Sequence, residues 1–327
     1  MLRYVLRRLV WLVPTLVLVT FLVYVAIRIG TDPVESFKRT NIRAGRKQID
    51  AYIRENGLYE GPLGYIRGYF EWLFNFVTFD WPRSIKGKRE VWPVLQDSLA
   101  NSLRLGVTAS VIGIVVGNLL GIFAALKPGR LRDSTVNTAA LIGLAVPPFI
   151  SALLLQLLFA VYWQKWFGTS LFPVSGVYPP GQRGFDLLTM LHHMALPVTV
   201  VAIQSMAVYA RYMRSSLLDV LNSEYMRTAR SKGISERQVL VKHGLRNALI
   251  PVTTLAFLDL GAIVGGLIIT EGLFDYPGMG RFFLVAYSNG DFPELMPWMV
   301  IIISAVVIFN LLADLAYAWL DPRIGLD

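Results

Sequence analysis

The sequence predicts an all-α integral membrane protein with six transmembrane helices. Hydrophobic residues make up 54% of the 327-residue chain and charged residues only 16%, whereas soluble proteins average about 25% charged residues. Six apolar runs also approach or exceed the roughly 20 residues that a helix needs to cross about 30 Å of hydrocarbon. Lipid is therefore the expected solvent for much of the chain.

The first apolar run, residues 9–26, follows basic residues at Arg3, Arg7 and Arg8. This start is also typical of a signal peptide, but the run is too long and no small-x-small cleavage site follows it before Arg28. We expect an uncleaved first span with its N-terminus in the cytoplasm, because Lys and Arg collect on that side.

Five further runs have the length of a span. Their approximate limits are residues 99–126, 135–162, 196–218, 249–270 and 296–320. Glycines recur every four residues in the second and fifth spans, at Gly113, Gly117 and Gly121 and at Gly261 and Gly265, which lets helix backbones approach closely. Two adjacent prolines, Pro147 and Pro148, are expected to interrupt the third span.

Charges in the loops predict the orientation of the spans. The loop 127–133 carries three basic residues, and residues 211–246 carry eight Lys or Arg against three acids. Both are expected in the cytoplasm, whereas loop 271–295, with one Arg against four acids, is expected outside. Strict alternation then places both termini in the cytoplasm. The net charge of +9 follows from this loop pattern and gives no support to nucleic-acid binding.

Residues 31–98 are too polar to enter lipid, with eleven basic and nine acidic side chains, and are predicted to form an extracytoplasmic helical insertion. The chain thus divides into residues 1–30, this insertion, and a five-helix core at 99–327. Amphipathic helices are expected at 44–57 and 62–76. The second carries an aromatic stripe that favours a core or interfacial role over a binding site. Its members are Tyr65, Tyr69, Trp72, Leu73 and Phe76.

The cytoplasmic segment after the fourth span predicts two short helices joined by a turn. The first would run over residues 224–232, with Gly233 in the left-handed position that ends it. Ser235 and Gln238 have the spacing of a capping box for the second helix.

Helices this short are marginal when isolated in water, so the pair should dock on something. Tyr225, Ala229, Val239 and Leu240 offer apolar contacts on a basic background, and Ile234 can pack on Val239. The alternative interpretation is that the helix pair forms a cytoplasmic cap that packs only on the helical bundle of this chain.

Two stretches of this segment resemble a known family. Residues 227–235 read Arg-Thr-Ala-Arg-Ser-Lys-Gly-Ile-Ser, and residues 242–251 read Lys-His-Gly-Leu-Arg-Asn-Ala-Leu-Ile-Pro. They are similar to the ATPase-coupling loop of binding-protein-dependent ABC importer permeases, specifically the dipeptide, oligopeptide and nickel branch. The family motif is Glu-Ala-Ala, three residues, Gly, nine residues, Ile, one residue, Leu-Pro. Ala229 matches its second Ala and Gly233 its Gly. Its Glu, first Ala, Ile and Pro are replaced by Arg227, Thr228, His243 and Arg246.

Four other signatures resemble the family in the same order along the chain. Residues 30–33 resemble its Gly-Asp-Pro with Thr31 inserted, and residues 56–58 resemble its external Leu-Gly-Leu element. Residues 274–281, Phe-Asp-Tyr-Pro-Gly-Met-Gly-Arg, resemble its loop after span five, and residues 320–323 resemble its C-terminal signature.

The resemblance implies a type I ABC importer permease fold in the inner membrane, forming half of a pathway for di- or oligopeptides, with nickel or another small solute as the alternative cargo. The implied partners are a second homologous permease, two ATPase subunits that hold ATP and magnesium, and an extracytoplasmic solute-binding protein. This chain itself would bind no cofactor. The implied coupling loop covers about residues 219–248. Its site residues are Glu224, Tyr225, Arg227, Thr228, Ala229, Gly233, Ser235, Arg237, His243 and Arg246.

The rival classes are a membrane enzyme and an ion-coupled transporter. The sequence contains no cysteine and no constellation of nucleophile and base. His192 and His193 are adjacent, so on a helix they diverge by about 100° and do not form a shared metal site. An ion-coupled carrier is expected to pair ionisable groups at midplane. Asp259 is instead expected to face other helices or the pathway.

The chain also lacks the phosphate-binding loop of an ATPase. The dipeptide Gly87-Lys88 is followed by Arg89 rather than by Ser or Thr. The sequence therefore predicts a subunit that is not itself catalytic and that takes its energy from a partner.

Overall fold

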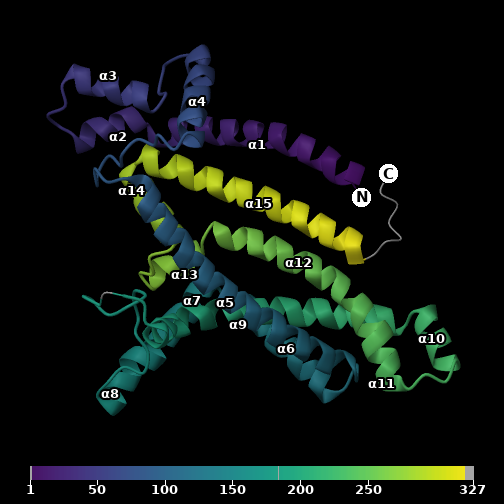
Figure 1. Ribbon diagram of the computed structural model, residues 1–327. Helices are drawn as coiled ribbons and strands as arrows, with labels where there is room; N and C mark the ends of the chain where they lie inside the picture. The colour runs from purple at the N-terminus through teal and green to yellow at the C-terminus, as the bar shows by residue number, and fades with distance from the viewer. Residues whose placement is uncertain (1, 183, 321–327) are drawn as a thin grey trace. The chain divides into compact units, whose positions relative to one another are not determined.

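The computed structural model describes the backbone of residues 2–182 and 184–320 and the side chains of residues 10–182 and 184–316. All regular elements in these residues are helical, and none of them is a strand (Figure 1). Six helical segments are long and apolar enough to cross a membrane. They are Val10–Thr31, Val91–Ala125, Pro148–Phe167, Leu187–Leu221, Glu236–Val264 and Phe292–Ala316. The predicted all-α membrane fold with six spans is confirmed.

The described chain forms two compact units. The first comprises the chain up to Leu103 with Val264–Gly272 and Pro277–Ile308, and the second comprises Arg104–Ile263, Leu273–Tyr276 and the chain from Phe309 on. Two long helices, α5 (Val91–Ala125) and α15 (Phe292–Leu320), contribute residues to both units.

The first unit is built around the first span and the polar insertion. Its other elements are α1 (Leu2–Thr31), α2 (Pro33–Thr40), α3 (Arg46–Glu55), α4 (Pro62–Val77), α13 (Ile268–Leu273) and α14 (Met279–Asn289). The helices expected at 44–57 and 62–76 are confirmed as α3 and α4. The short α2 was not predicted; it is set by Pro33 at its first turn and by Asp32, whose carboxylate accepts a hydrogen bond from the Glu35 amide at 3.1 Å.

Aromatic rings form the core of the first unit. Tyr69 on α4 packs edge-on against Tyr24 on α1, with ring centroids 5.7 Å apart, and Tyr24 packs in the same way on Phe292. Trp72 is also buried, and Tyr65, Leu73 and Phe76 pack against the same cluster. The aromatic stripe of α4 is therefore a core face, as the helical spacing predicted.

The second unit is organised around α9 (Leu187–Leu221). Its other elements are α6 (Leu131–Ala145), α7 (Pro148–Gln156), the π-helical η1 (Leu157–Tyr162), α8 (Trp163–Phe167), α10 (Glu224–Ser231), α11 (Glu236–Gln238), the π-helical η2 (Val239–Leu245) and α12 (Arg246–Val264). The glycine stripe of α5 faces α9: a Cβ on Gly117 would lie 2.8 Å from the Cβ of Tyr209, and one on Gly121 would lie 2.8 Å from that of Met213. The predicted close helix approach is confirmed here.

The third expected span, residues 135–162, is divided by a break before Pro148. α6 ends at Ala145, and α7 begins at Pro148, whose ring fixes φ and whose nitrogen carries no hydrogen to donate to the preceding turn. The interruption predicted from the two prolines is confirmed. The predicted limits are wrong, because the helix long and apolar enough to cross is Pro148–Phe167.

The fifth expected span, residues 249–270, is wrong at both ends. The helix begins much earlier, at Glu236, and stops at Val264. It stops because Gly266 takes a left-handed backbone with φ of +85°, a conformation that is inexpensive only for glycine. Apolar residues continue past this turn, so hydropathy alone extended the span too far.

Candidate functional site

The turn between α10 and α11 has the conformation expected from its glycine. α10 ends at Ser231, and Gly233 follows with φ of +73°. Its amide donates a hydrogen bond to the Arg230 carbonyl at 3.0 Å, which helps to close the helix end. A Cβ on Gly233 would meet no atom within 4 Å. The backbone conformation, and not lack of space, is therefore the reason for glycine at this position.

The predicted capping box at Ser235 is wrong. Ser235 occupies the N-cap position of α11 with extended backbone, but in the described chain its side chain makes no capping hydrogen bond. The turn is instead bridged by Arg230, whose Nη2 lies 3.0 Å from Oε1 of Glu236. This ion pair joins the last turn of α10 to the first residue of α11.

The second helix of the pair is not short, which corrects the expectation of two small helices. α11, η2 and α12 form one helical run, Glu236–Val264, of 29 residues. At 1.5 Å per residue this run is about 43 Å long. The turn at Gly233 is therefore attached directly to the helix that contains the fifth span.

A small apolar cluster holds α10 against this long helix. Met226 and Val239 are fully buried, Ala229 is nearly so, and Ile234 packs on the same cluster. The predicted contact of Ile234 with this group is confirmed. The expectation that Ala229 and Val239 offer contacts to a partner is wrong, because both are covered by the chain itself.

Two other apolar side chains remain exposed on this segment. Tyr225 on α10 is 46% exposed, and Val241 on η2 is 55% exposed. Tyr225 was predicted as a contact residue, whereas Val241 was missed, although its position two residues after the buried Val239 places it on nearly the opposite side of the helix. These two side chains are the apolar surface that the segment presents.

The remaining surface of the segment is basic. The acids Glu224 and Glu236 are paired with Arg227, at 2.9 Å, and with Arg230, at 3.0 Å. Of the ten predicted site residues, all are exposed except half-buried His243 and buried Ala229. Further exposed cations on the segment are Lys232, Arg237, Lys242 and Arg246. Such a surface is complementary to an acidic groove with an apolar floor.

Asp259 in the fifth span makes an interhelical hydrogen bond. The hydroxyl of Tyr209 on α9 donates to Oδ2 of Asp259 at 2.6 Å, and Tyr209 is fully buried. A polar group inside the membrane needs such a partner. The bond supports the interhelical role that was one of the two predicted for Asp259.

An ion pair between Asp133 and Arg214 was not predicted. Arg214 on α9 donates from Nε to Oδ1 of Asp133 at 2.5 Å and from Nη2 to Oδ2 at 2.8 Å. The Gly129 amide donates to the same carboxylate at 2.8 Å. Chiefly because of the Arg214 hydrogen bonds, the pKa of Asp133 is lowered to about 2. The basic loop 127–133 is thereby fixed to α9.

Glu271 is the second important acid that sequence reasoning missed. It is fully buried and accepts hydrogen bonds from the Ser102 hydroxyl at 2.6 Å and from the Gly280 amide at 2.7 Å. The amides of Leu267, at 3.0 Å, and Arg281, at 3.3 Å, donate to it as well. Its place just before the Phe-Asp-Tyr-Pro-Gly-Met-Gly-Arg motif was the signal available in the sequence.

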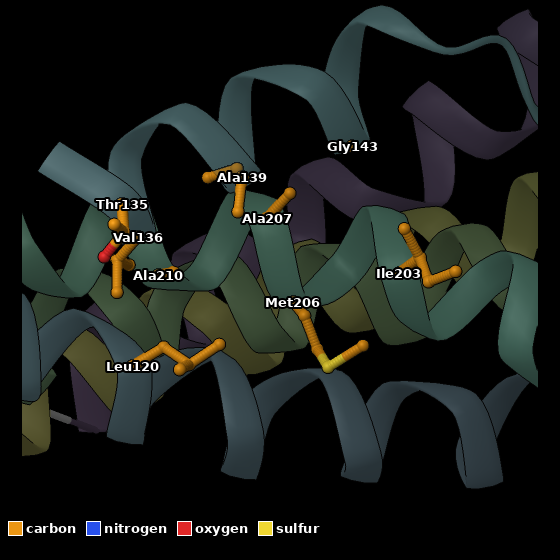
Figure 2. Close-up of a pocket in the computed structure, with 10 residues that line it drawn as sticks. Leu120, Thr135, Val136, Ala139, Gly143, Ile203, Met206, Ala207 and Ala210 are labelled. Atoms are coloured by element: carbon orange, nitrogen blue, oxygen red, sulfur yellow. The ribbon is translucent and has the colours of Figure 1, made fainter. Parts of the chain in front are cut away.

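The second unit contains two cavities of different chemistry. One, of about 380 Å³, lies among α5, α6 and α9 and is almost wholly apolar, as its lining residues in Figure 2 show. The other, of about 520 Å³, is lined in part by Asn137, Arg211, Tyr212 and Arg214. The first suits a hydrocarbon or an apolar side chain. The second suits an anionic or amide group.

Each of the two adjacent histidines contacts a backbone carbonyl, and the two carbonyls are different. His192 Nε2 lies 2.7 Å from the Leu171 carbonyl, and His193 Nδ1 lies 3.1 Å from the Ser175 carbonyl. No group of three or more metal-ligating side chains occurs in the described part of the chain.

Comparison with known proteins decides the family. Residues 117–326 match the family described as "Binding-protein-dependent transport system inner membrane component". The chain belongs to this permease family. It is 35% identical to the oligopeptide transport system permease protein AppB of Bacillus subtilis over 327 residues, covering 99% of each chain. It is also 35% identical to the dipeptide transport system permease protein DppB of the same organism, covering 100% of this chain and 99% of that one.

A solved structure supports the fold of this permease. The MetNI methionine ABC transporter, in inward-facing conformations, matches with a TM-score of 0.51 and 16% identity, covering 70% of this chain and 96% of the other. The family membership confirms the resemblance stated from the coupling-loop motif. The permease is a multi-pass membrane subunit of a binding-protein-dependent ABC importer; it works with other ABC components and is not itself catalytic.

Proposed function

We propose that this permease carries dipeptides or oligopeptides into the cell across the inner membrane. The proposal is supported by the named function of full-length relatives, which include both dipeptide and oligopeptide permeases. In the working complex it pairs with a second homologous permease. Two ATPase subunits bind ATP and magnesium and hydrolyse the ATP, and an extracytoplasmic binding protein delivers the cargo.

In this proposal the segment 222–246 faces the cytoplasm and docks on an ATPase subunit. Tyr225 and Val241 enter an apolar part of the ATPase surface, and the surrounding cations meet acidic side chains. Arg227, Arg237 and Arg246 lie in this segment as exposed cations that support such complementarity.

The observation that carries the mechanism is the single helix Glu236–Val264. ATP binding closes the two ATPases and shifts α10; the buried contact of Met226 with Val239 transfers the shift to the helix, and the fifth span tilts. Repeated tilting opens the pathway alternately to the two sides of the membrane, which is alternating access.

Docking is tested by comparing two exposed apolar positions on the segment with one elsewhere. Tyr225→Ala and Val241→Ser should reduce both co-purification of the ATPase and cargo uptake by about tenfold, as expected for loss of an interface anchor worth about 1.4 kcal/mol. Ile42→Ala, at an exposed position in the insertion, is the matched control and should leave both unchanged. Full uptake by the Tyr225 and Val241 variants would refute docking through this surface.

Cargo is tested separately with the binding protein and the reconstituted complex. Calorimetry should detect binding of di- or tripeptides to the binding protein. Proteoliposomes in which the ATPase subunits face the lumen should accumulate the same labelled peptides only when ATP is enclosed in that lumen. Binding of a nickel chelate, without any peptide, would replace the peptide assignment while leaving the importer mechanism intact.

A further inference from the structure

The helix α4 (Pro62–Val77) carries three distinct faces. Its buried face contains the core residues Tyr69 and Trp72. A polar face contains Arg67 and Glu71, which form an i,i+4 ion pair at 2.7 Å. The third face is apolar and exposed. Its residues are Leu63, Ile66, Phe70, Phe74 and Val77, which are exposed by 82%, 47%, 55%, 67% and 66%.

The spacing of the exposed apolar residues places them in one stripe. They follow one another by three or four positions, which at 100° per residue confines them to a sector of about 80°. No charged residue interrupts the stripe, because the charged pair lies on the neighbouring face. Five large apolar side chains on one helix face form a larger continuous patch than scattered surface residues do.

Contacts with the first span place α4 at membrane depth. The Tyr69 hydroxyl donates a hydrogen bond to the Val17 carbonyl at 3.0 Å and lies 2.7 Å from Oγ1 of Thr20. Thr20 is eleven residues, or about 16 Å, from the end of the span at Thr31. A tyrosine side chain is far shorter than this distance. The backbone of α4 therefore lies below the level at which α1 leaves the apolar layer.

The direction of α4 also differs from that of a span. Figure 1 shows α4 crossing α1 at a steep angle rather than running beside it. At its start, Tyr65 receives the guanidinium of Arg28 over its ring at 4.0 Å, near the polar end of α1. A helix that crosses a span steeply, near one end, runs close to the plane of the membrane.

We propose that α4 is an interfacial helix whose Leu63, Ile66, Phe70, Phe74 and Val77 stripe is immersed in the acyl chains of the bilayer. Its polar face, with Arg67 and Glu71, then meets the headgroups and water, and its aromatic face is fixed on α1. Interfacial helices are typically immersed by about 5–10 Å, with polar and apolar faces divided in this way.

The occupant of the stripe is lipid because α4 contacts α1 at a level where α1 exposes apolar side chains. Leu18 and Leu22, at the level of the Tyr69 contact but on another face of α1, are 59% and 57% exposed in a helix of membrane-spanning length. A partner protein at the polar insertion is the competing occupant. Such a partner would be expected to contact a mixed surface with polar groups, and the stripe contains none.

Spin labels on single cysteines test this inference, since the chain has no native cysteine. Phe70→Cys and Phe74→Cys are labelled in the complete transporter, in nanodiscs of phosphatidylethanolamine and phosphatidylglycerol. The accessibility of each label to oxygen, which concentrates in lipid, is compared with its accessibility to a water-soluble nickel chelate. Leu18→Cys provides the lipid control, and Ile42→Cys, 89% exposed in the insertion, provides the water control.

Labels at Phe70 and Phe74 should resemble the Leu18 label, with oxygen accessibility at least severalfold above nickel accessibility. A label that resembles the Ile42 label would overturn the inference by showing a stripe in water. Low accessibility to both reagents would also overturn it, because it would show a protein partner on the stripe. The result does not depend on which solute is transported, so the cargo proposal can fail without affecting it.

Discussion

Two glycine turns in this permease use the same backbone conformation in different surroundings. Gly233, in the second unit, has φ of +73° and open space where a Cβ would stand. Gly266, in the first unit, has φ of +85°, and a Cβ there would lie 2.9 Å from Cα of Gly280 and from the Met279 carbonyl carbon. Glycine is required at Gly233 by conformation alone and at Gly266 by conformation and packing together.

The difference indicates two separate roles. The Gly266 turn is packed against backbone that cannot rotate away, and it is fixed further by the nearby Glu271 carboxylate, so it is part of the folded core. The Gly233 turn is exposed and is joined to the rest of the chain mainly by its two helices. A substitution at Gly266 should therefore affect folding, and one at Gly233 should affect coupling.

Gly266→Ala should have the largest effect. The left-handed penalty of about 1 kcal/mol adds to an overpacking cost of about 1–3 kcal/mol. We expect a severalfold loss of permease in the membrane and a lower melting temperature in detergent, measured by immunoblot and by thermal unfolding. Wild-type abundance and stability would show that the turn does not have the packed geometry described.

Glu271→Gln should have the next largest effect. The amide nitrogen of Gln cannot accept the hydrogen bonds that one carboxylate oxygen now receives from the Gly280 and Arg281 amides. Hydrogen bonds to a charged group contribute about 1.5–3 kcal/mol, so stability should fall by roughly that amount. Ser102→Ala removes a donor to the same carboxylate and also the oxygen that accepts from the Met279 amide at 2.7 Å, so it should lower stability in the same thermal assay as well.

Gly233→Val should leave the abundance of the permease unchanged and reduce uptake. A β-branched residue costs about 1 kcal/mol or more at positive φ, so one helix of the turn should tilt or fray while the spans still insert. Gly233→Asn should be milder, because Asn tolerates the left-handed region. Uptake is measured per unit of assembled complex, and wild-type uptake by the Val variant would exclude the turn from coupling.

A third glycine turn, at Gly129, allows a prediction of how stability depends on pH. Gly129 has φ of +72° and open space, like Gly233, but its amide is bound to Asp133. The folded-state pKa of Asp133, about 2, lies below the ordinary value of 3.8, so the stabilisation is complete above about pH 4 and is lost as pH falls toward 2. Between pH 5 and 8, the melting temperatures of the wild type and of Asp133→Asn should therefore change with pH in the same way. The variant should have the lower melting temperature throughout this range. A difference in slope within that range would contradict the assignment.

Asp259→Asn should have the smallest effect on transport. Asn retains an oxygen that accepts the Tyr209 hydrogen bond, so uptake should stay close to that of the wild type. Tyr209→Phe removes the hydroxyl that donates to Asp259. This variant should reduce the amount of folded permease more than Asp259→Asn does. Loss of uptake by Asp259→Asn with normal assembly and ATP turnover would indicate a direct role in the pathway.

The sequence was sufficient for features that depend on local chemistry. Hydropathy predicted six spans, and the left-handed preference of glycine predicted the Gly233 turn. The end of the fifth helix at Val264 was not predictable from apolarity, because Leu267, Ile268 and Ile269 continue the apolar run beyond the turn. The burial of Val239 and the cradle of amides around Glu271 depend on residues brought together by tertiary folding, which a pattern of neighbours does not contain.

The domain limits at 1–30, 31–98 and 99–327 and the coupling role of the site residues remain predictions. They depend on the position of the bilayer and on partner subunits, neither of which is encoded in a local pattern. The comparison of exposed Tyr225 with buried Val239 makes the second of these directly testable.

The most direct measurement is cross-linking from single cysteines to the ATPase subunit in the assembled transporter. Tyr225→Cys should form a cross-link with a short thiol reagent in inside-out vesicles, and an impermeant reagent added outside intact cells should not label it. Val239→Cys, at a fully buried position of the same segment, should give neither product. A cross-link from Tyr225 to the ATPase supports the account that the Gly233 turn couples ATP hydrolysis to the fifth span. Labelling of Tyr225→Cys from outside, or no cross-link in a complex that still transports, would contradict it.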